Sequence, residues 1–383
     1  MLPFHYAARN LLRSKSRLLQ TIGGSALVVL LVMAAVAINQ GMNRVLSASG
    51  SPRNVILLGT GSEESVQRSE VAAAAAGIAA AGIPGVSEEL GTRAVSPEIH
   101  YMNHLGLPGG QRSQALIRGV TPEALRVHPE VRITGGTFPR AGQVMAGRLA
   151  WRKLGIGEDS LRVGSEVTLD GQSLTVSGIF AAPGTVLESE IWAPLGDLHV
   201  LARRESLSCV VLRLDDPADF TEADLFAKQR LDLELSAMRE SDYYGQLRHF
   251  FKPLRVMIWI TAGLIASGAV LGGINTLYAA FASRVRELAT LQSIGFSRRT
   301  LLWSLVQEST LACLTGTLLA SAAAVLLLDG RTVPFSIGSF TVEIGPDVAL
   351  AGILTGALLG LLGALPPAIR CLKPPLPAAL RMS

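Results

Sequence analysis

The sequence predicts a membrane protein with four transmembrane α-helices and a large α+β extracytoplasmic domain inserted between the first and second helices. Only 17% of the residues are charged, whereas soluble domains carry about 25%. Four apolar stretches are long enough to cross a hydrocarbon core of roughly 30 Å. Residues 42–253, which separate the first two stretches, have the mixed composition of a folded domain.

The four apolar stretches define the expected spans. In lipid, only helices and closed barrels satisfy every backbone group, so each stretch is predicted to be a helix. For the first stretch there is an alternative, because Ala35-Val36-Ala37 resembles a signal-peptide cleavage site. The apolar run is longer than a signal core, which favours a retained helix. The spans are Leu18 to Ile38, the stretch between Arg255 and Arg284, the stretch between Arg299 and Asp329, and Val348 to Ile369.

The charged flanks of these spans predict the orientation. The flanks predicted to lie on one side of the membrane contain one acidic residue, Glu287, and eleven basic residues: Arg9, Arg13, Lys15, Arg17, Arg284, Arg286, Arg298, Arg299, Arg370, Lys373 and Arg381. Basic flanks stay in the cytoplasm. We therefore expect a cytoplasmic (inner) membrane protein whose two termini and 284–299 connection are cytoplasmic and whose residues 42–253 are extracytoplasmic.

The pI of about 9.1 reflects this topology, because acidic residues outnumber basic ones in 42–253 and the remainder is net basic. A nucleic-acid partner is therefore not expected. Residues 3–17 have apolar residues at helical spacing, with Arg9 and Arg13 on other faces. They are predicted to form an amphipathic helix on the membrane surface; the alternative is a charged flank that only sets topology.

The chain divides into 1–41 with the first span, 42–253, and 254–383 with the other three spans. In 42–253, the Ala-rich segment 63–81 is predicted to be helical and to stop at Gly82-Ile83-Pro84-Gly85. Asp170-Gly171 predicts a hairpin turn between two strands. The segment 218–251 is predicted to be mostly helical and leads into the second span, so helical stalks should carry this domain. Further β-rich runs cover 115–120, 163–169, 174–180 and 209–214.

No catalytic or metal-binding group stands out. His100 and His104 are four residues apart, which on a helix suits a metal, but no third ligand is evident and a plain surface pair is the alternative. The three cysteines suggest no disulfide framework. None of the five lysines follows a glycine, so the chain lacks a Walker A loop. It is not expected to be an enzyme or to bind a cofactor; ATP and Mg²⁺ would be bound by a partner subunit.

Several motifs resemble those of the FtsX/MacB/LolC-type ABC permeases. The connection Ser283-Arg-Val-Arg-Glu-Leu-Ala-Thr-Leu-Gln-Ser-Ile-Gly-Phe-Ser-Arg-Arg299 is similar to that family's signature between the second and third spans. Asn10-Leu-Leu-Arg-Ser-Lys15, Val306-Gln-Glu308 and the tail from Pro367-Ala-Ile-Arg370 to Pro377-Ala-Ala-Leu380 match other family features. Each motif alone is weak, but their order along this topology is specific.

The 42–253 segment resembles the MacB-like periplasmic core domain. Four motifs follow one another in the order of that domain: Ile117-Arg-Gly-Val120, Gly142-Gln-Val-Met-Ala-Gly147, Val163-Gly164 and Ser189-Glu-Ile-Trp-Ala-Pro194. The resemblance thus covers nearly the whole chain. It implies an extracytoplasmic core domain combined with an FtsX-like transmembrane domain.

The resemblance also implies a function. Two permease copies, identical or different, pair in the lipid membrane, and two cytoplasmic ABC ATPases dock on their coupling helices. ATPase motion is then relayed to the outer domains, a mechanotransmission that exports or extracts an amphiphilic cargo, with a periplasmic adaptor as a further partner in a transport system. The alternative is an FtsX-like regulator that activates a cell-wall hydrolase without transport. A membrane-anchored enzyme is a third hypothesis.

The 284–299 connection is the expected ATPase-coupling element. On a helix, Val285, Leu288 and Leu291 line one face, and Arg284, Arg286 and Glu287 place charge elsewhere. Gly295 is expected to end this helix and Ser297 to cap the next one. An ordinary charged loop is the alternative.

Two features of the spans are also singled out. Glu308 is an intramembrane charge, for which we weigh pairing with Arg284, Arg298 or Arg299 against a proton-relay role. Glycines at four-residue spacing favour close helix packing, within the chain or between copies. They are Gly268 and Gly272 in the second span, and Gly352, Gly356 and Gly360 in the fourth.

Overall fold

The computed structural model describes residues 15–107 and 110–381, and the described chain forms two compact units. The helical unit comprises residues up to Gln40, Pro253–Arg331 and the residues from Val342 onward. The β-rich unit comprises Gly41–Lys252 and Thr332–Thr341. The amphipathic helix expected over 3–17 falls almost entirely outside the described residues.

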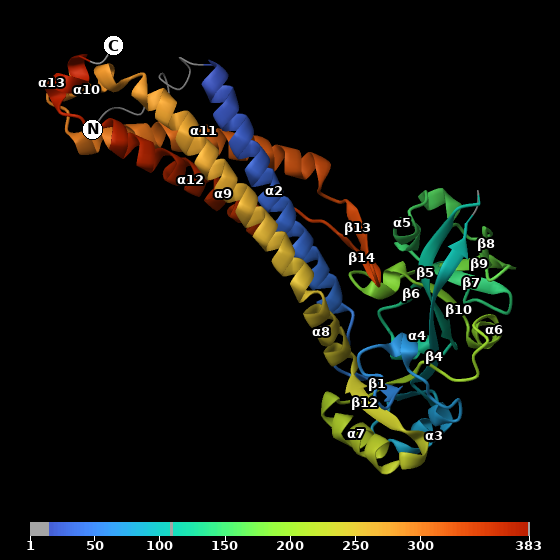
Figure 1. The fold of residues 1–383 in the computed structure, drawn as a ribbon. Helices are drawn as coiled ribbons and strands as arrows, with labels where there is room; N and C mark the ends of the chain where they lie inside the picture. Colours follow the sequence, from blue (N-terminus) through green and yellow to red (C-terminus); the bar gives the residue numbers. More distant parts are fainter. Residues whose placement is uncertain (1–14, 108–109, 382–383) are drawn as a thin grey trace. The chain divides into compact units, whose positions relative to one another are not determined.

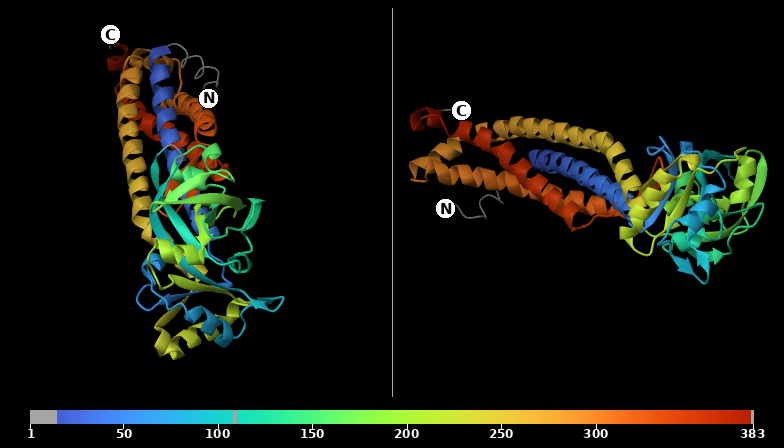
Figure 2. Two further views of the ribbon diagram at one scale, coloured as in Figure 1. Left: turned by 90° about the vertical axis from the view of Figure 1, so that its right-hand side faces the viewer. Right: turned by 90° about the horizontal axis from the view of Figure 1, so that it is seen from below.

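Four helices of the described chain are long and apolar enough to cross a membrane, as predicted. They are α2 (Lys15–Ala48), α9 (Lys252–Ala282), α11 (Arg298–Leu327) and α12 (Pro346–Cys371), and α8 (Glu240–Phe250) leads into α9. The part of α2 beyond Gln40 belongs to the β-rich unit. In the helical unit the four long helices run beside one another (Figures 1 and 2). Two short helices, α10 (Val285–Ser293) and α13 (Leu376–Arg381), complete this unit.

A mixed ten-stranded sheet organises the β-rich unit. Its main path runs β12-β1-β11-β4-β5-β10-β7-β9-β6, and β8 pairs with β4 and β9. The strands are β1 (Asn54–Gly59), β4 (Val95–Gly106), β5 (Arg112–Val120), β6 (Arg132–Gly136), β7 (Gln143–Gly147), β8 (Glu166–Leu169), β9 (Gln172–Ala181), β10 (Ile191–Pro194), β11 (Cys209–Arg213) and β12 (Leu235–Arg239). A separate small pair joins β2 (Glu88–Glu89) and β3 (Thr92–Arg93).

Short helices cover this sheet. The helices α3 (Ala75–Gly82) and α7 (Phe220–Gln229) lie together at the end that carries β1 and β12 (Figure 1). They meet closely, because a Cβ added at Gly82 would lie 2.7 Å from the Phe226 ring. The others are α4 (Ala124–Val127), α5 (Ala150–Leu154) and α6 (Leu195–Leu201).

The predicted Asp170-Gly171 hairpin is present. Strands β8 and β9 pair antiparallel up to Leu169 opposite Gln172, so the loop has two residues. Both adopt positive φ, 48° at Asp170 and 84° at Gly171. This is the backbone that a type I′ turn requires and that Asp-Gly readily adopts.

Two secondary-structure expectations for this unit were wrong in detail. In 63–81 the helix is limited to a 3₁₀ turn, Val66–Arg68, and the start of α3. Between them Val71 forms a β-bridge with Leu207, and the Ser69 hydroxyl accepts the Gly59 amide, so tertiary contacts hold this stretch extended. In 218–251 a strand, β12, interrupts the helices because it pairs with β1.

The connection between α11 and α12 folds with the β-rich unit, although the sequence analysis grouped it with 254–383. Its strands β13 (Thr332–Phe335) and β14 (Gly338–Thr341) form a hairpin. The Lys153 ammonium donates to the Ser336 carbonyl at 3.1 Å, and the Phe335 ring lies 5.8 Å from that of Phe251. The hairpin is thereby fixed to α5 and to the residues that follow α8.

Candidate functional site

The connection between α9 and α11 contains the amphipathic helix α10. Its inner face, Val285, Leu288 and Ala289, is buried in a cluster with residues of α11, α12 and α13. The predicted apolar face is therefore occupied by this chain's own helices. Leu291, the third residue predicted for that face, is half-buried at its edge.

The outer face of α10 is polar except at its end. Arg286, Glu287, Thr290 and Ser293 are exposed. The side chain of Ile294, directly after the helix, is 71% exposed. A short charged helix that ends on an exposed aliphatic side chain suits docking into a groove of another protein. Sequence reasoning did not include Ile294, because the helical pattern alone did not show which apolar residues are covered.

The ends of α10 are defined as the sequence suggested. Gly295 has a φ of 110°, a conformation that glycine adopts without strain, and it reverses the chain. The Ser297 hydroxyl then accepts the Thr300 backbone N–H at 3.3 Å and caps α11. Arg284, before α10, pairs with Glu308 of α11, the two side chains being 15% and 14% exposed. Among the three pairings considered for Glu308, the structure shows the one with Arg284.

Three motifs far apart in the sequence meet around α10. Leu288 of the 283–299 connection, Val306 of Val306-Gln-Glu308 and Ala379 of the C-terminal tail are buried in the same cluster. Arg370 of the tail lies over the Tyr278 ring, 5.5 Å from its centroid. The motifs that are weak singly therefore build one structural element that positions α10.

The glycines of α12 face other helices of the same chain. A Cβ at Gly352 would lie 2.8 Å from the Met33 sulfur of α2, and one at Gly360 would lie 2.6 Å from the Thr310 Cα of α11. Gly356 faces Thr317 in the same way. These glycines allow α2, α11 and α12 to approach closely.

The glycines of α9 behave differently. Gly268 and Gly272 are exposed and have no atom within 4 Å of an added Cβ. Gly272, with Gly24 and Gly363, lines a cavity of about 250 Å³ between the four long helices. Large apolar side chains on α9, including Ile260 and Leu264, are also more than half exposed. Within the described residues, α9 is the long helix with the least covered surface.

A network of buried charges crosses the β-rich unit. Arg118 of β5 donates two hydrogen bonds of 2.7 Å to the carboxylate of Glu190, just before β10, and a third of 2.7 Å to Glu98 of β4. The Trp192 indole donates to Glu190 at 3.0 Å. Although burial alone would raise it, the pKa of Glu98 is held well below its ordinary value, chiefly by Arg118. Arg118 and Glu190 both belong to motifs quoted for the family, so the structure gives those motifs a physical role.

The network continues through His128 to Glu240. The His128 ring is fully buried, with Nε2 3.5 Å from Glu98 and Nδ1 3.4 Å and 3.8 Å from Glu130 and Glu240. Burial alone would lower the pKa of His128, but the three carboxylates outweigh it and raise this pKa to about 10. Burial is the main cause that raises the pKa of Glu240. We call Glu190, Arg118, Glu98, His128 and Glu240 the charge ladder.

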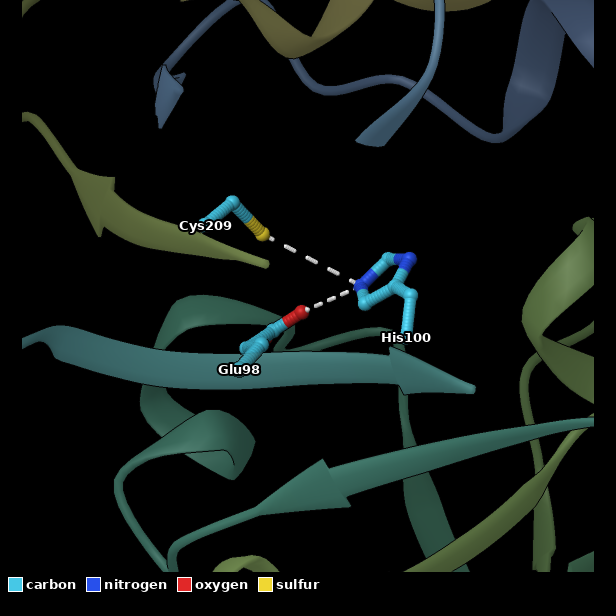
Figure 3. Close-up of side chains that lie close together, drawn as sticks. All are labelled: Glu98, His100 and Cys209. Carbon is cyan, nitrogen blue, oxygen red and sulfur yellow. Dashed lines mark hydrogen bonds and ion pairs between the residues drawn. The ribbon is translucent and has the colours of Figure 1, made fainter. Parts of the chain in front are cut away.

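Glu98, His100 and Cys209 form a cluster beside this ladder (Figure 3). His100 Nε2 lies 3.0 Å from Glu98 Oε2 and 4.0 Å from Cys209 Sγ. The same Glu98 oxygen already accepts from Arg118, so a metal cation there would sit beside a guanidinium. Burial raises the pKa of the Cys209 thiol well above its ordinary value, which disfavours the thiolate that a metal needs. We therefore assign the cluster to the charge ladder.

The metal hypothesis for His100 with His104 is wrong in its geometry. Both lie on strand β4 and not on a helix, and four residues along a strand span about 13 Å. The plain surface pair is also wrong for His100, which is bonded to Glu98, whereas His104 is exposed. Sequence reasoning missed the charge ladder because its members are spread over 143 positions, from 98 to 240.

Two family models of known proteins match parts of the chain. The family model of the MacB-like periplasmic core domain matches residues 18–224. The model of the FtsX-like permease C-terminal domain matches residues 259–376. No curated protein matches the chain.

Two solved structures are similar to parts of the chain. The periplasmic region of MacB from Actinobacillus actinomycetemcomitans is 12% identical, with a TM-score of 0.40, over 54% of this chain and 96% of that one. The extracellular domain of the ABC-type transporter YknZ from Gram-positive bacteria is 14% identical, with a TM-score of 0.37, over 49% of this chain and 100% of that one.

Proposed function

Because this chain belongs to the family of FtsX/MacB-type ABC permeases, we propose that it is the permease subunit of an ATP-driven system that relays ATPase motion to its β-rich unit. The cargo proposed is amphiphilic, and it is exported or extracted as in MacB- and LolC-type systems. The observation that carries the proposal is α10. Its inner face is buried against α11–α13, and its polar outer face and Ile294 are exposed.

The partners follow from this proposal. A cytoplasmic ABC ATPase binds ATP and Mg²⁺ and docks on the outer face of α10, since no lysine of this chain follows a glycine. A second permease copy packs on the exposed side of α9 around Gly268 and Gly272, where small residues permit close approach in lipid. Both termini lie in the cytoplasm and residues 42–253 outside the inner membrane.

A regulatory role is the second candidate. An FtsX-like protein would use the same coupling to activate a cell-wall hydrolase without moving cargo. A sequence observation bears on this choice, since the β-rich unit matches the MacB-like core domain. For that reason we place transport first in the proposal and regulation second.

Deletion of the gene, complemented by wild type or by an Ile294→Asp variant, tests the proposal. We expect the deletion to increase retention of an amphiphilic antibiotic, peptide or lipoprotein, and only the wild type to restore its removal. Normal removal of such compounds, together with altered wall-hydrolase activity, would favour the regulatory role. Full complementation by the variant at normal expression would contradict the role of α10.

A further inference from the structure

The ends of two helical segments of the β-rich unit meet at one carboxylate, that of Glu240. One segment is the end of α2 from Gly41 to Ala48, and the other is α8, whose first residue is Glu240. Glu240 Oε2 accepts the Ser51 backbone N–H at 3.0 Å, three residues after α2, and the Asn54 amide at 2.9 Å. The residue that begins one segment therefore holds the chain that leaves the other.

The surroundings fix this carboxylate in place. Glu240 is 2% exposed, and its second oxygen faces His128, the last step of the charge ladder. The Asn54 amide also donates to the Val127 carbonyl at 3.1 Å. Backbone contact is equally close, since a Cβ at Gly50 would lie 2.7 Å from the Glu240 carbonyl oxygen. Both segment ends are thus attached to the interior of the sheet through Glu240.

An ordinary helix-terminus effect does not account for this arrangement. An acidic residue in the first turn of α8 is favourable because of the helix dipole. That effect needs no distant partner, whereas Ser51 and Asn54 are 189 and 186 positions away. Hydrogen bonds from such partners to a buried carboxyl group fix its geometry, because breaking them leaves a buried polar group without partners.

We propose that Glu240 is the positioning residue that holds the ends of the two segments against each other and against the sheet, with the charge ladder setting where its carboxylate lies. A role of Glu240 in transmitting motion rests on the proposed function, because α2 and α8–α9 are the segments that would carry that motion. The positioning of the two segment ends by Glu240 does not rest on the proposed function, so it can be tested without an ATPase.

Glu240→Gln in the full chain in lipid nanodiscs is the main test. In this variant an NH₂ group replaces one carboxylate oxygen. In either orientation of the side-chain amide, this NH₂ faces another donor, either protonated His128 or the Ser51 backbone N–H. Glu130→Gln is the matched control, because Glu130 also contacts His128 and neither Ser51 nor Asn54 is among its bonded partners. Spin labels at Ala48→Cys and Val200→Cys, both exposed, report the distance between the end of α2 and helix α6.

We expect one narrow distance distribution in the wild type and in Glu130→Gln, its loss in Glu240→Gln, and partial recovery in Glu240→Asp. Hydrogen exchange at the Ser51 amide should be roughly tenfold to a hundredfold faster in Glu240→Gln. An unchanged distribution in Glu240→Gln would overturn the proposal. If that variant fails to fold, the wild type alone decides: a Ser51 amide that exchanges as fast as exposed loop amides overturns it, and protection like that of β1 supports it.

Discussion

Arg284 donates from one guanidinium nitrogen to both carboxylate oxygens of Glu308, at 3.1 and 3.0 Å. Arg284 precedes α10, and Glu308 lies on α11. The pair therefore fixes the start of α10 against the helix that follows it. We therefore assign this ion pair the role of positioning α10, the helix that we propose as the ATPase-docking element.

Replacing Glu308 by Gln should loosen α10. The pair is largely buried, so Arg284 loses a charged hydrogen-bond partner there, at a cost of about 2 kcal/mol. We expect faster hydrogen exchange of the 285–293 amides. The double replacement Arg284→Met with Glu308→Leu should cost less than the sum of the single changes; strict additivity would show that the two side chains do not interact.

Arg118→Met should destabilise the β-rich unit strongly. Glu190 would remain buried without its cation and Glu98 would lose its closest one, and breaking a buried pair in this way costs about 3–5 kcal/mol. The thermal midpoint of the full chain should fall clearly. Arg162→Met is the control, because its pair with Asp159 is exposed and such pairs contribute about 1 kcal/mol or less. Equal midpoints for the two variants would contradict the structural role of the charge ladder.

The stability of the β-rich unit should decrease as the pH rises above neutrality. The pKa of His128 is about 10 in the folded chain, against an ordinary value of 6.5. Below 6.5 the contribution of protonated His128 is fully present. Between 6.5 and 10 the unfolded chain releases this proton and the folded chain keeps it, so the free energy of unfolding falls by up to about 1.4 kcal/mol per pH unit.

His128→Gln removes that contribution. The difference in thermal midpoint between wild type and variant should shrink as the pH rises through this window. A difference that stays constant from pH 6.5 to 10 would show that the three carboxylates do not keep His128 protonated over this range.

Gly360→Ala and Gly268→Ala should act in opposite directions. Alanine is a better helix former than glycine by up to about 1 kcal/mol. At Gly268 nothing lies within 4 Å of the added carbon, so a single copy should keep this gain. At Gly360 the carbon would meet the α11 backbone, and overpacking typically costs about 1–3 kcal/mol. The thermal midpoints of the two variants in detergent measure this difference. Equal changes in midpoint would argue against the close α11–α12 contact.

Local sequence patterns predicted the parts of the fold that depend on local physics. The four apolar helices, the Asp170-Gly171 hairpin and the Ser297 cap each depend on a few neighbouring residues. The strand β12 and the extended stretch around Val71 were missed because pairing with β1 and with Leu207 overrides local preference. The sequence also could not show that Val285 and Leu288 are covered and Ile294 is free, since that depends on α11–α13.

Recovery of an ATPase with the purified chain tests the central claim most directly. The full chain is purified from its native membrane as wild type, as a Glu287→Lys, Ile294→Asp variant of α10, and as a Leu231→Asp control, whose site is 80% exposed in the β-rich unit. We predict that a subunit with a Walker A loop copurifies with the wild type and the control and is lost from the α10 variant. Equal recovery with the α10 variant, or no such subunit with the wild type, would contradict the account.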